Sequence, residues 1–337
     1  MQLSTPKDCK SGLIFKVHHV FDVLVRPFRQ RWLIEDLWLA TGVGILAGHP
    51  KSGKTFCAAQ FALAVASNGK VFGRYPVHRS GPVLFYGAED TLEDLRERFS
   101  GLAQIYALDL QKLPIYLLDV PVLRLDRESD LDLLREEIVK LKPRLLVLDP
   151  FVRMARIDEN SAADVSGVLG SLREIQRTYD LAILLVHHAR KSPAANLTQA
   201  FRGSSDFAAW SDSNLYLARH TNRLTLTLEH RSAASPEPID LRLIKKPIPH
   251  LCLLENNAAD DAQEHTLDAL QQEILERLET SRRPMSTVEL RKLLCKRKGD
   301  VVRALDDLVE VKRVVRTKRG WILCSMQQDL FEHARAP

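Results

Sequence analysis

The chain has 337 residues, of which 45% are hydrophobic and 27% are charged, and its formal net charge is +5. This composition is typical of an ordinary globular protein. No apolar run approaches the ~20 residues of a membrane span, so we expect none. Charged residues and histidines interrupt the N-terminal apolar stretch, so we do not expect it to be a secretory leader. The cysteines form no C-x-x-C pair, which indicates reduced thiols in a cytoplasmic protein without a zinc site.

Residues 1–30 form an N-terminal segment. Residues 13–25 are rich in β-branched and aromatic side chains and predict a strand or a short helix, which Pro27 ends. An amphipathic stretch follows from Trp32 to Leu39. We expect Trp32 and Trp38 to pack in the core or an interface rather than to stack on a base.

The stretch from Gly48 to Thr55 reads G-x-x-x-x-G-K-T, between a β-prone apolar run at 43–47 and an Ala-rich run at 56–66. Strand, loop and helix in this order predict a phosphate-binding loop for ATP. The glycines let backbone N–H groups face a polyphosphate, and the helix N-terminus adds partial positive charge. Lys54 can reach the β- and γ-phosphates, and the Thr55 hydroxyl can bind Mg²⁺. The expected nucleotide-binding residues are Gly48, Lys51, Ser52, Gly53, Lys54 and Thr55.

Two later strands end in acids. An apolar strand at 83–86 leads to Gly87-Ala88-Glu89-Asp90 and then to a helix over 92–99, whereas a helix over 130–141 precedes a strand at 145–148 that ends in Asp149. A carboxylate at that strand end would lie beside the phosphate loop and orient the Mg²⁺ hydration shell. We therefore predict Asp149 as the partner of Thr55 in a metal site.

Alternating strands and helices continue to about residue 255. The pattern predicts a short strand at 115–118, a helix over 160–179, a strand at 181–186 before His187-His188, an antiparallel pair at 213–218 and 224–229, and short strands near 241–244 and 251–254. This order predicts an α/β domain over residues 31–255 with a mostly parallel central sheet. Residues 256–263 are small and polar, as expected of a linker.

Five elements occur in one order: the loop, the Gly87–Asp90 turn, the strand to Asp149, the His187-His188 pair and Arg202-Gly203-Ser204-Ser205. Together they resemble the RecA-like ATPases of the hexameric RepA type, the replicative helicases of mobilisable plasmids, over roughly residues 30–255. The resemblance implies that Glu89 is the general base that polarises the attacking water, and Asp90 is expected as a helix cap. It implies His188, or His187, as a γ-phosphate sensor, with a core histidine as an equal alternative. It implies Arg202 as an arginine finger that reaches the neighbouring subunit of a hexameric ring.

Residues 264–324 predict a small separate domain, followed by a tail over 325–337. Three helices precede a hairpin over 314–323; a capping box at Ser286–Glu289 opens the second helix, and Asp300 can cap the third. This order resembles a winged helix-turn-helix. Residues 282–320 hold thirteen Lys/Arg and five Asp/Glu, a net charge of +8 against +5 for the whole chain. We expect a DNA backbone as the partner, with protein recognition as the alternative.

The sequence thus predicts an ATP-hydrolysing, ring-forming DNA motor that uses Mg²⁺, a replicative-type helicase of a mobile element. Its expected catalytic residues are Lys54, Glu89, Asp149, Arg202 and His188. Single-stranded DNA would pass through the ring beside loops at 153–160 and 191–200, and the winged helix would touch duplex DNA. The alternative is a DNA-binding ATPase that acts as a regulator or as a recombination or replication accessory without unwinding.

Overall fold

The structure, a computed structural model, describes residues 17–25, 27–157, 161–189, 206–219, 223–254, 269–281, 283–310, 313–317 and 320–325. Several predicted features lie outside these residues: Arg202 with the Gly-Ser-Ser that follows it, the expected loop over 191–200, the linker over 256–263 and the C-terminal tail. Within the described residues, no helix combines the length and the apolar character that crossing a membrane requires.

A nine-stranded sheet forms the centre of the described part of the chain, in the order β13-β12-β11-β10-β3-β9-β8-β6-β7. Neighbours from β10 to β7 pair in parallel, and those from β10 to β13 pair antiparallel. The strands are β3 (Val43–Gly48), β6 (Val83–Gly87), β7 (Ile115–Leu117), β8 (Leu145–Asp149), β9 (Ala182–His188), β10 (Ser213–Arg219), β11 (Leu224–His230), β12 (Ile239–Ile244) and β13 (His250–Leu253). The mostly parallel sheet and the antiparallel strands after it confirm the predicted α/β architecture, which is that of a RecA-like core.

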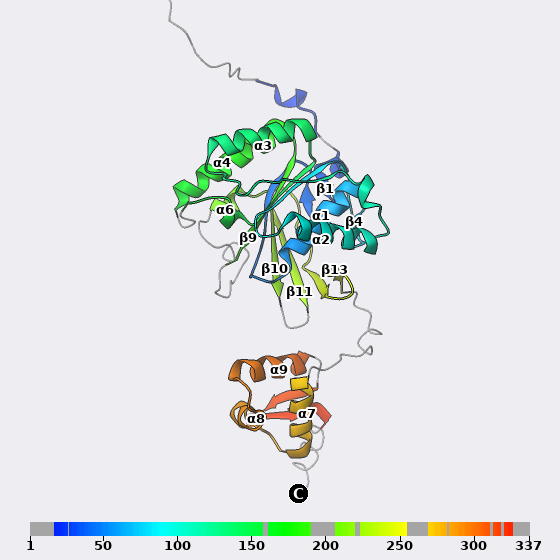
Figure 1. The fold of residues 1–337 in the computed structure, drawn as a ribbon, viewed down its shortest axis with the longest axis vertical. Helices are drawn as coiled ribbons and strands as arrows, with labels where there is room; N and C mark the ends of the chain where they lie inside the picture. The colour runs from blue at the N-terminus through cyan, green and yellow to red at the C-terminus, as the bar shows by residue number, and fades with distance from the viewer. Residues whose placement is uncertain are drawn as a thin grey trace, which may run out of the picture.

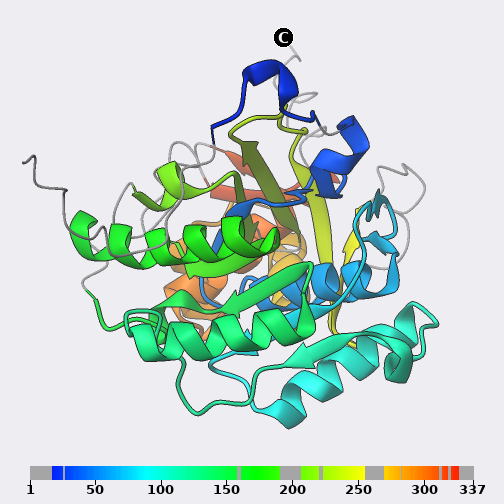
Figure 2. The same cartoon turned by 90° about the horizontal axis from the view of Figure 1, so that it is seen from above.

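Helices cover both faces of this sheet (Figures 1 and 2). On one side lie α1 (Lys54–Ser67) and α2 (Leu92–Ile105), and on the other lie α3 (Glu128–Leu141), α4 (Ala162–Tyr179) and α6 (Asp206–Trp210). The strands supply both cores by alternation: on β3, Leu46 belongs to the core under α1, whereas Ile45 belongs to the core under α4. This two-sided burial explains why the central strands are continuously apolar.

Short elements surround the sheet. The hairpins are β1 (Trp32–Ile34) with β2 (Trp38–Leu39) and β4 (Lys70–Val71) with β5 (Tyr75–Pro76), and short 3₁₀ turns lie at Val20–Asp22, Phe28–Arg31, Leu110–Lys112 and Phe151–Arg153. Trp32 and Trp38 are buried, which confirms their predicted packing role. In the N-terminal segment, the stretch predicted as a strand or short helix contains the 3₁₀ turn Val20–Asp22.

The C-terminal elements build a hydrophobic cluster of their own. They are α7 (Ala269–Ser281), α8 (Thr287–Leu294), α9 (Lys298–Glu310) and the hairpin of β14 (Val314–Thr317) and β15 (Gly320–Leu323). The predicted capping box is confirmed, because Ser286 and Glu289 bond reciprocally at the start of α8. Trp321 joins the hairpin to this helix by donating from Nε1 to the Thr287 hydroxyl at 3.0 Å.

One C-terminal prediction is wrong. Asp300 does not cap α9, because the helix begins two residues earlier at Lys298 and takes Asp300 into its first turn. An acid in that turn still interacts favourably with the helix dipole.

A test of the central packing uses Gly44 on β3. A Cβ at this position would collide with the Ser213 carbonyl oxygen of β10 and lie 2.7 Å from the Trp38 ring. We expect Gly44→Ala to lower the free energy of unfolding by at least ~2 kcal/mol, because neither neighbour can move away cheaply.

Urea unfolding of the purified variants measures this loss. Gly170→Ala is the matched control, since Gly170 is exposed on α4 with no described atom within 4 Å of its Cβ position. The control should be unchanged or gain ~0.5–1 kcal/mol. Equal stability of the two variants would contradict the packing described for Gly44.

Candidate nucleotide-binding site

The loop between β3 and α1 has the backbone that its glycines allow. Gly53 has φ +93°, and a Cβ on Gly48 would lie 2.6 Å from the Leu217 carbonyl oxygen of β10. Gly53 also stands at the N-cap of α1, so no side chain caps the helix. The first N–H groups of α1 therefore remain available to an anion, as phosphate binding requires.

Lys54 is the most enclosed cation of this loop, with 7% of its surface exposed. Its ammonium group donates to the carbonyl oxygens of Gly48 and His49, both at 2.9 Å. Burial lowers the pKa of Lys54, and the charges of Asp149 and Glu89 oppose this effect. Both predicted acids therefore lie within electrostatic reach of Lys54.

Asp149 ends β8 and is buried beside the start of α1. Burial raises its pKa to about 6, against which a hydrogen bond from the Thr55 side chain and the charge of Lys54 act. Its Oδ2 atom is buried and has no hydrogen-bond partner among the described residues. A carboxylate with an unused oxygen, bonded to a hydroxyl, is a donor set that fits Mg²⁺. Thr55 and Asp149 could thus hold the metal that the fold implies.

Glu89 lies two residues beyond the end of β6, where the Ala88 N–H donates to the Asp149 carbonyl oxygen at 2.7 Å. This backbone bond brings the two strand ends together. The carboxylate of Glu89 is half-exposed and accepts a hydrogen bond from Arg153 Nε at 2.7 Å. The candidate general base is therefore ion-paired with a residue of the turn that follows β8.

Asp90 does not cap α2, contrary to the sequence-based prediction. Thr91 is the N-cap and forms a capping box with Asp94. Asp90 instead accepts two hydrogen bonds from Arg98, at 2.8 and 3.2 Å. The guanidinium of Arg98 also lies 5.0 Å from the ring centroid of Phe56. Sequence reasoning missed Arg98, because the sequence of α2 does not show which partner an arginine on it will bind.

A hollow of about 660 Å³ opens beside this group. Phe56 and Arg98 line it from α1 and α2, and Ile248 lines it from the turn between β12 and β13. Phe56 follows Thr55 directly in sequence, so the hollow adjoins the phosphate loop. The carboxylates of Asp94 and Glu97 also line it, and its aromatic ring, guanidinium and apolar wall suit a planar heterocycle.

The two histidines of β9 have different surroundings. His187 is completely buried, stacks on Phe207 with ring centroids 4.5 Å apart and meets the edge of Phe151. His188 is partly exposed at the end of the strand, where it pairs in register with Gly48. The core-histidine alternative therefore describes His187, and His188 is the one beside the phosphate loop.

Arg219, at the end of β10, is a second residue that sequence reasoning missed. Its guanidinium donates to the Lys51 carbonyl oxygen at 2.8 Å. Residues 51 and 219 are remote in sequence, and only the parallel pairing of β10 with β3 brings them together.

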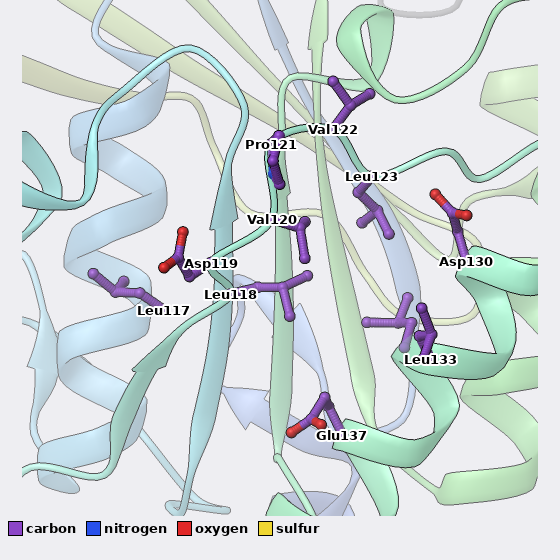
Figure 3. Close-up of a pocket in the computed structure, with 11 residues that line it drawn as sticks. Leu117, Leu118, Asp119, Val120, Pro121, Val122, Leu123, Asp130, Leu133 and Glu137 are labelled. Carbon is purple, nitrogen blue, oxygen red and sulfur yellow. The ribbon is translucent and has the colours of Figure 1, made fainter.

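A separate apolar hollow of about 570 Å³ lies between α3 and the connection that follows β7. Figure 3 shows Leu118, Leu123 and Leu133 directed into it, with the carboxylates of Asp119, Asp130 and Glu137 around it. The described residues that line it include no cation and none of the phosphate-loop residues. Its chemistry therefore does not suit a nucleotide.

Comparison with known proteins identifies a family. A family model described as an AAA domain matches residues 15–194, and no curated protein matches the chain significantly. One structural neighbour is a solved ATPase domain, with 16% identity, coverage of 64% of this chain and 86% of that one, and a TM-score of 0.50.

Two further solved structures resemble the chain. The RadB recombinase has 16% identity, 64% and 92% coverage of this chain and its own, and a TM-score of 0.49. A KaiC-like protein from Pyrococcus horikoshii has 16% identity, 66% and 94% coverage, and a TM-score of 0.48. At 16% identity, what the solved ATPase domain with the TM-score of 0.50 shares with this chain is the fold alone.

The raised pKa of Asp149 makes a pH-dependent prediction. Because its pKa rises from 3.8 to about 6 on folding, ionisation of Asp149 weakens the fold as pH increases through this interval. We expect Asp149→Asn to increase the free energy of unfolding by ~2–3 kcal/mol at pH 8, with the gain disappearing near pH 4.

The measurement is chemical unfolding at a series of pH values without nucleotide or Mg²⁺. Asp119→Asn, at an exposed acid outside the phosphate site, is the control and should change little at any pH. A stabilisation by Asp149→Asn that is equal at pH 4 and pH 8 would contradict the burial of an ionisable group at this position.

Proposed function

Because the chain belongs to the AAA domain family, we propose that it hydrolyses ATP and uses the energy to move along DNA as a ring-forming, helicase-type motor. The observation that carries the hydrolytic part is the convergence of Lys54, Asp149 and Glu89 beside one uncapped helix N-terminus. A cation, a metal-binding acid and a second acid are the groups that phosphoryl transfer to water needs.

Each residue would have a separate role. The loop N–H groups and Lys54 would hold the β- and γ-phosphates, and Thr55 with Asp149 would hold Mg²⁺, which withdraws charge from the phosphate oxygens. Glu89 would accept a proton from water while the water oxygen bonds to the γ-phosphorus. The bond between the γ-phosphorus and the bridging oxygen breaks, and ADP and phosphate leave. The hollow beside Phe56 and Arg98 would take the base.

The ring and its DNA path are further parts of the proposal. Arg202 would act as the finger supplied to a neighbouring subunit, and His188 would contact the γ-phosphate from the strand end beside Gly48. Arg153 and Arg156 are exposed after β8, at the start of the first expected DNA loop. Cations at that position support a path for a phosphate backbone.

The C-terminal elements would act as a winged helix on duplex DNA. Exposed basic residues gather on α8, on the turn after it and on α9. They are Arg291, Lys292, Lys296, Arg297, Lys298 and Arg303. This basic group also favours the second candidate function, a DNA-binding ATPase that acts as a regulator or as a recombination or replication accessory without unwinding.

Strand separation of a forked DNA duplex with ATP and Mg²⁺ tests the motor directly. We expect the wild type to unwind the fork, Glu89→Gln to bind ATP without cleaving it, and Lys54→Ala to lose ATP binding. Loss of the general base should lower turnover by ~10²-fold or more. ATP binding is measured separately with a fluorescent analogue.

The outcomes separate the candidates. DNA-stimulated ATP cleavage without unwinding would support the accessory function. Normal turnover by Glu89→Gln would remove Glu89 as the base, and ordinary ATP affinity in Lys54→Ala would refute the site.

A second test concerns the C-terminal basic group. We expect the double variant Lys296→Ala, Arg297→Ala to bind duplex DNA more weakly, because it loses contacts to phosphates. Its affinity should also depend less on salt, since each lost phosphate contact makes the fall of log K with log salt less steep by ~0.9. Arg277→Ala is the control, at an exposed arginine of α7 outside the basic group. Fluorescence anisotropy over a salt series measures both; unchanged duplex affinity in the double variant would assign these elements to protein recognition instead.

A further inference from the structure

The ion pair between Glu89 and Arg153 joins two functions that sequence reasoning kept separate. Glu89 is the candidate general base, and Arg153 begins the segment expected to face DNA. Arg153 Nε donates to Glu89 Oε1 at 2.7 Å, so the guanidinium takes a carboxylate oxygen that a water molecule would need.

The backbone on both sides of the pair is fixed. Phe151 and Met154 flank Arg153 and are completely buried, which anchors the 3₁₀ turn that carries it. On the other side, Gly87 pairs in register with Asp149. The two side chains therefore meet because the scaffold aligns them, and only their torsion angles are free to change.

The two side chains are nevertheless open to solvent. The exposed fractions are 62% for Arg153 and 47% for Glu89. An exposed pair of this kind contributes only ~0–1 kcal/mol, so a phosphate group that approaches Arg153 can displace the carboxylate at little cost. A guanidinium binds phosphate in a bidentate manner and is well suited to make this exchange.

We propose that Arg153 is a positioning residue that couples nucleic-acid binding to ATP cleavage. Without DNA, it holds the Glu89 carboxylate away from the attacking water. When a DNA phosphate takes the guanidinium, Glu89 is released to accept the water's proton. This inference rests on the proposed function, because it requires that Glu89 is the base and that DNA is the ligand.

The experiment measures steady-state ATP turnover of the full-length chain, with and without saturating oligo(dT), for the wild type and Arg153→Ala. We expect Arg153→Ala to raise kcat without DNA by about five-fold, which corresponds to ~1 kcal/mol. KM for ATP should not change, because the groups proposed to hold ATP are Lys54 and the loop N–H groups, not Arg153. Stimulation by oligo(dT) should fall to nearly one-fold even when anisotropy shows the oligonucleotide bound.

A binding readout separates this role from a merely structural one. Arg153→Ala should lower the slope of log K against log salt for oligo(dT) by ~0.7, the value for one phosphate contact to a single strand. Arg135→Ala is the matched control, since Arg135 forms ion pairs with Glu128 and Asp132 on α3. It should leave turnover, stimulation and slope unchanged.

The possible failures differ. A variant with wild-type basal turnover and full stimulation, or with lower basal turnover, would overturn the coupling while leaving the proposed ATPase intact. A wild type whose ATP turnover does not respond to oligo(dT) would overturn the coupling together with the DNA part of the proposed function.

Discussion

The site depends on the parallel register of β3, β9, β8 and β6. This pairing brings four strand ends to one edge of the sheet, with His188 beside Gly48 and Asp149 beside Gly87. Because side chains alternate between the two faces, a slip of one residue in any strand would exchange the residues that it supplies to the two cores and would displace the site residue at its end. The apolar run of each strand therefore fixes the site as well as the core.

Burial opposes the ionisation of both charged residues at the centre of this edge. It lowers the pKa of Lys54 and raises that of Asp149, and their mutual attraction offsets these effects only in part. A ligand that supplies phosphate charge to Lys54 and a divalent cation to Asp149 would favour the ionised form of each. The electrostatics of the site thus favour a metal–polyphosphate complex over a simple anion.

Much of this arrangement was predictable because its determinants are local. The phosphate loop and its flanking strand and helix lie within 25 consecutive residues, from Val43 to Ser67, and the capping box of α8 lies within four residues of sequence. The role of Asp90 was not predictable, because Thr91 competes for the N-cap position of α2 and forms the capping box with Asp94. Arg219 finds its partner through tertiary packing, and Arg153 meets Glu89 through the register of β6 with β8. Sequence periodicity does not encode such pairings.

Glu89 and Asp90 are neighbours in one turn, but their ion pairs differ in solvent exposure and therefore suit different roles. Asp90 binds Arg98 through two hydrogen bonds, and the side chains are only 26% and 17% exposed. Glu89 binds Arg153 through one hydrogen bond between side chains that are 47% and 62% exposed. A bidentate, shielded pair resists exchange with solvent and ions, whereas a single exposed contact is readily replaced. Asp90 is therefore suited to hold α2 against the site, and Glu89 is suited to change partners during a reaction cycle.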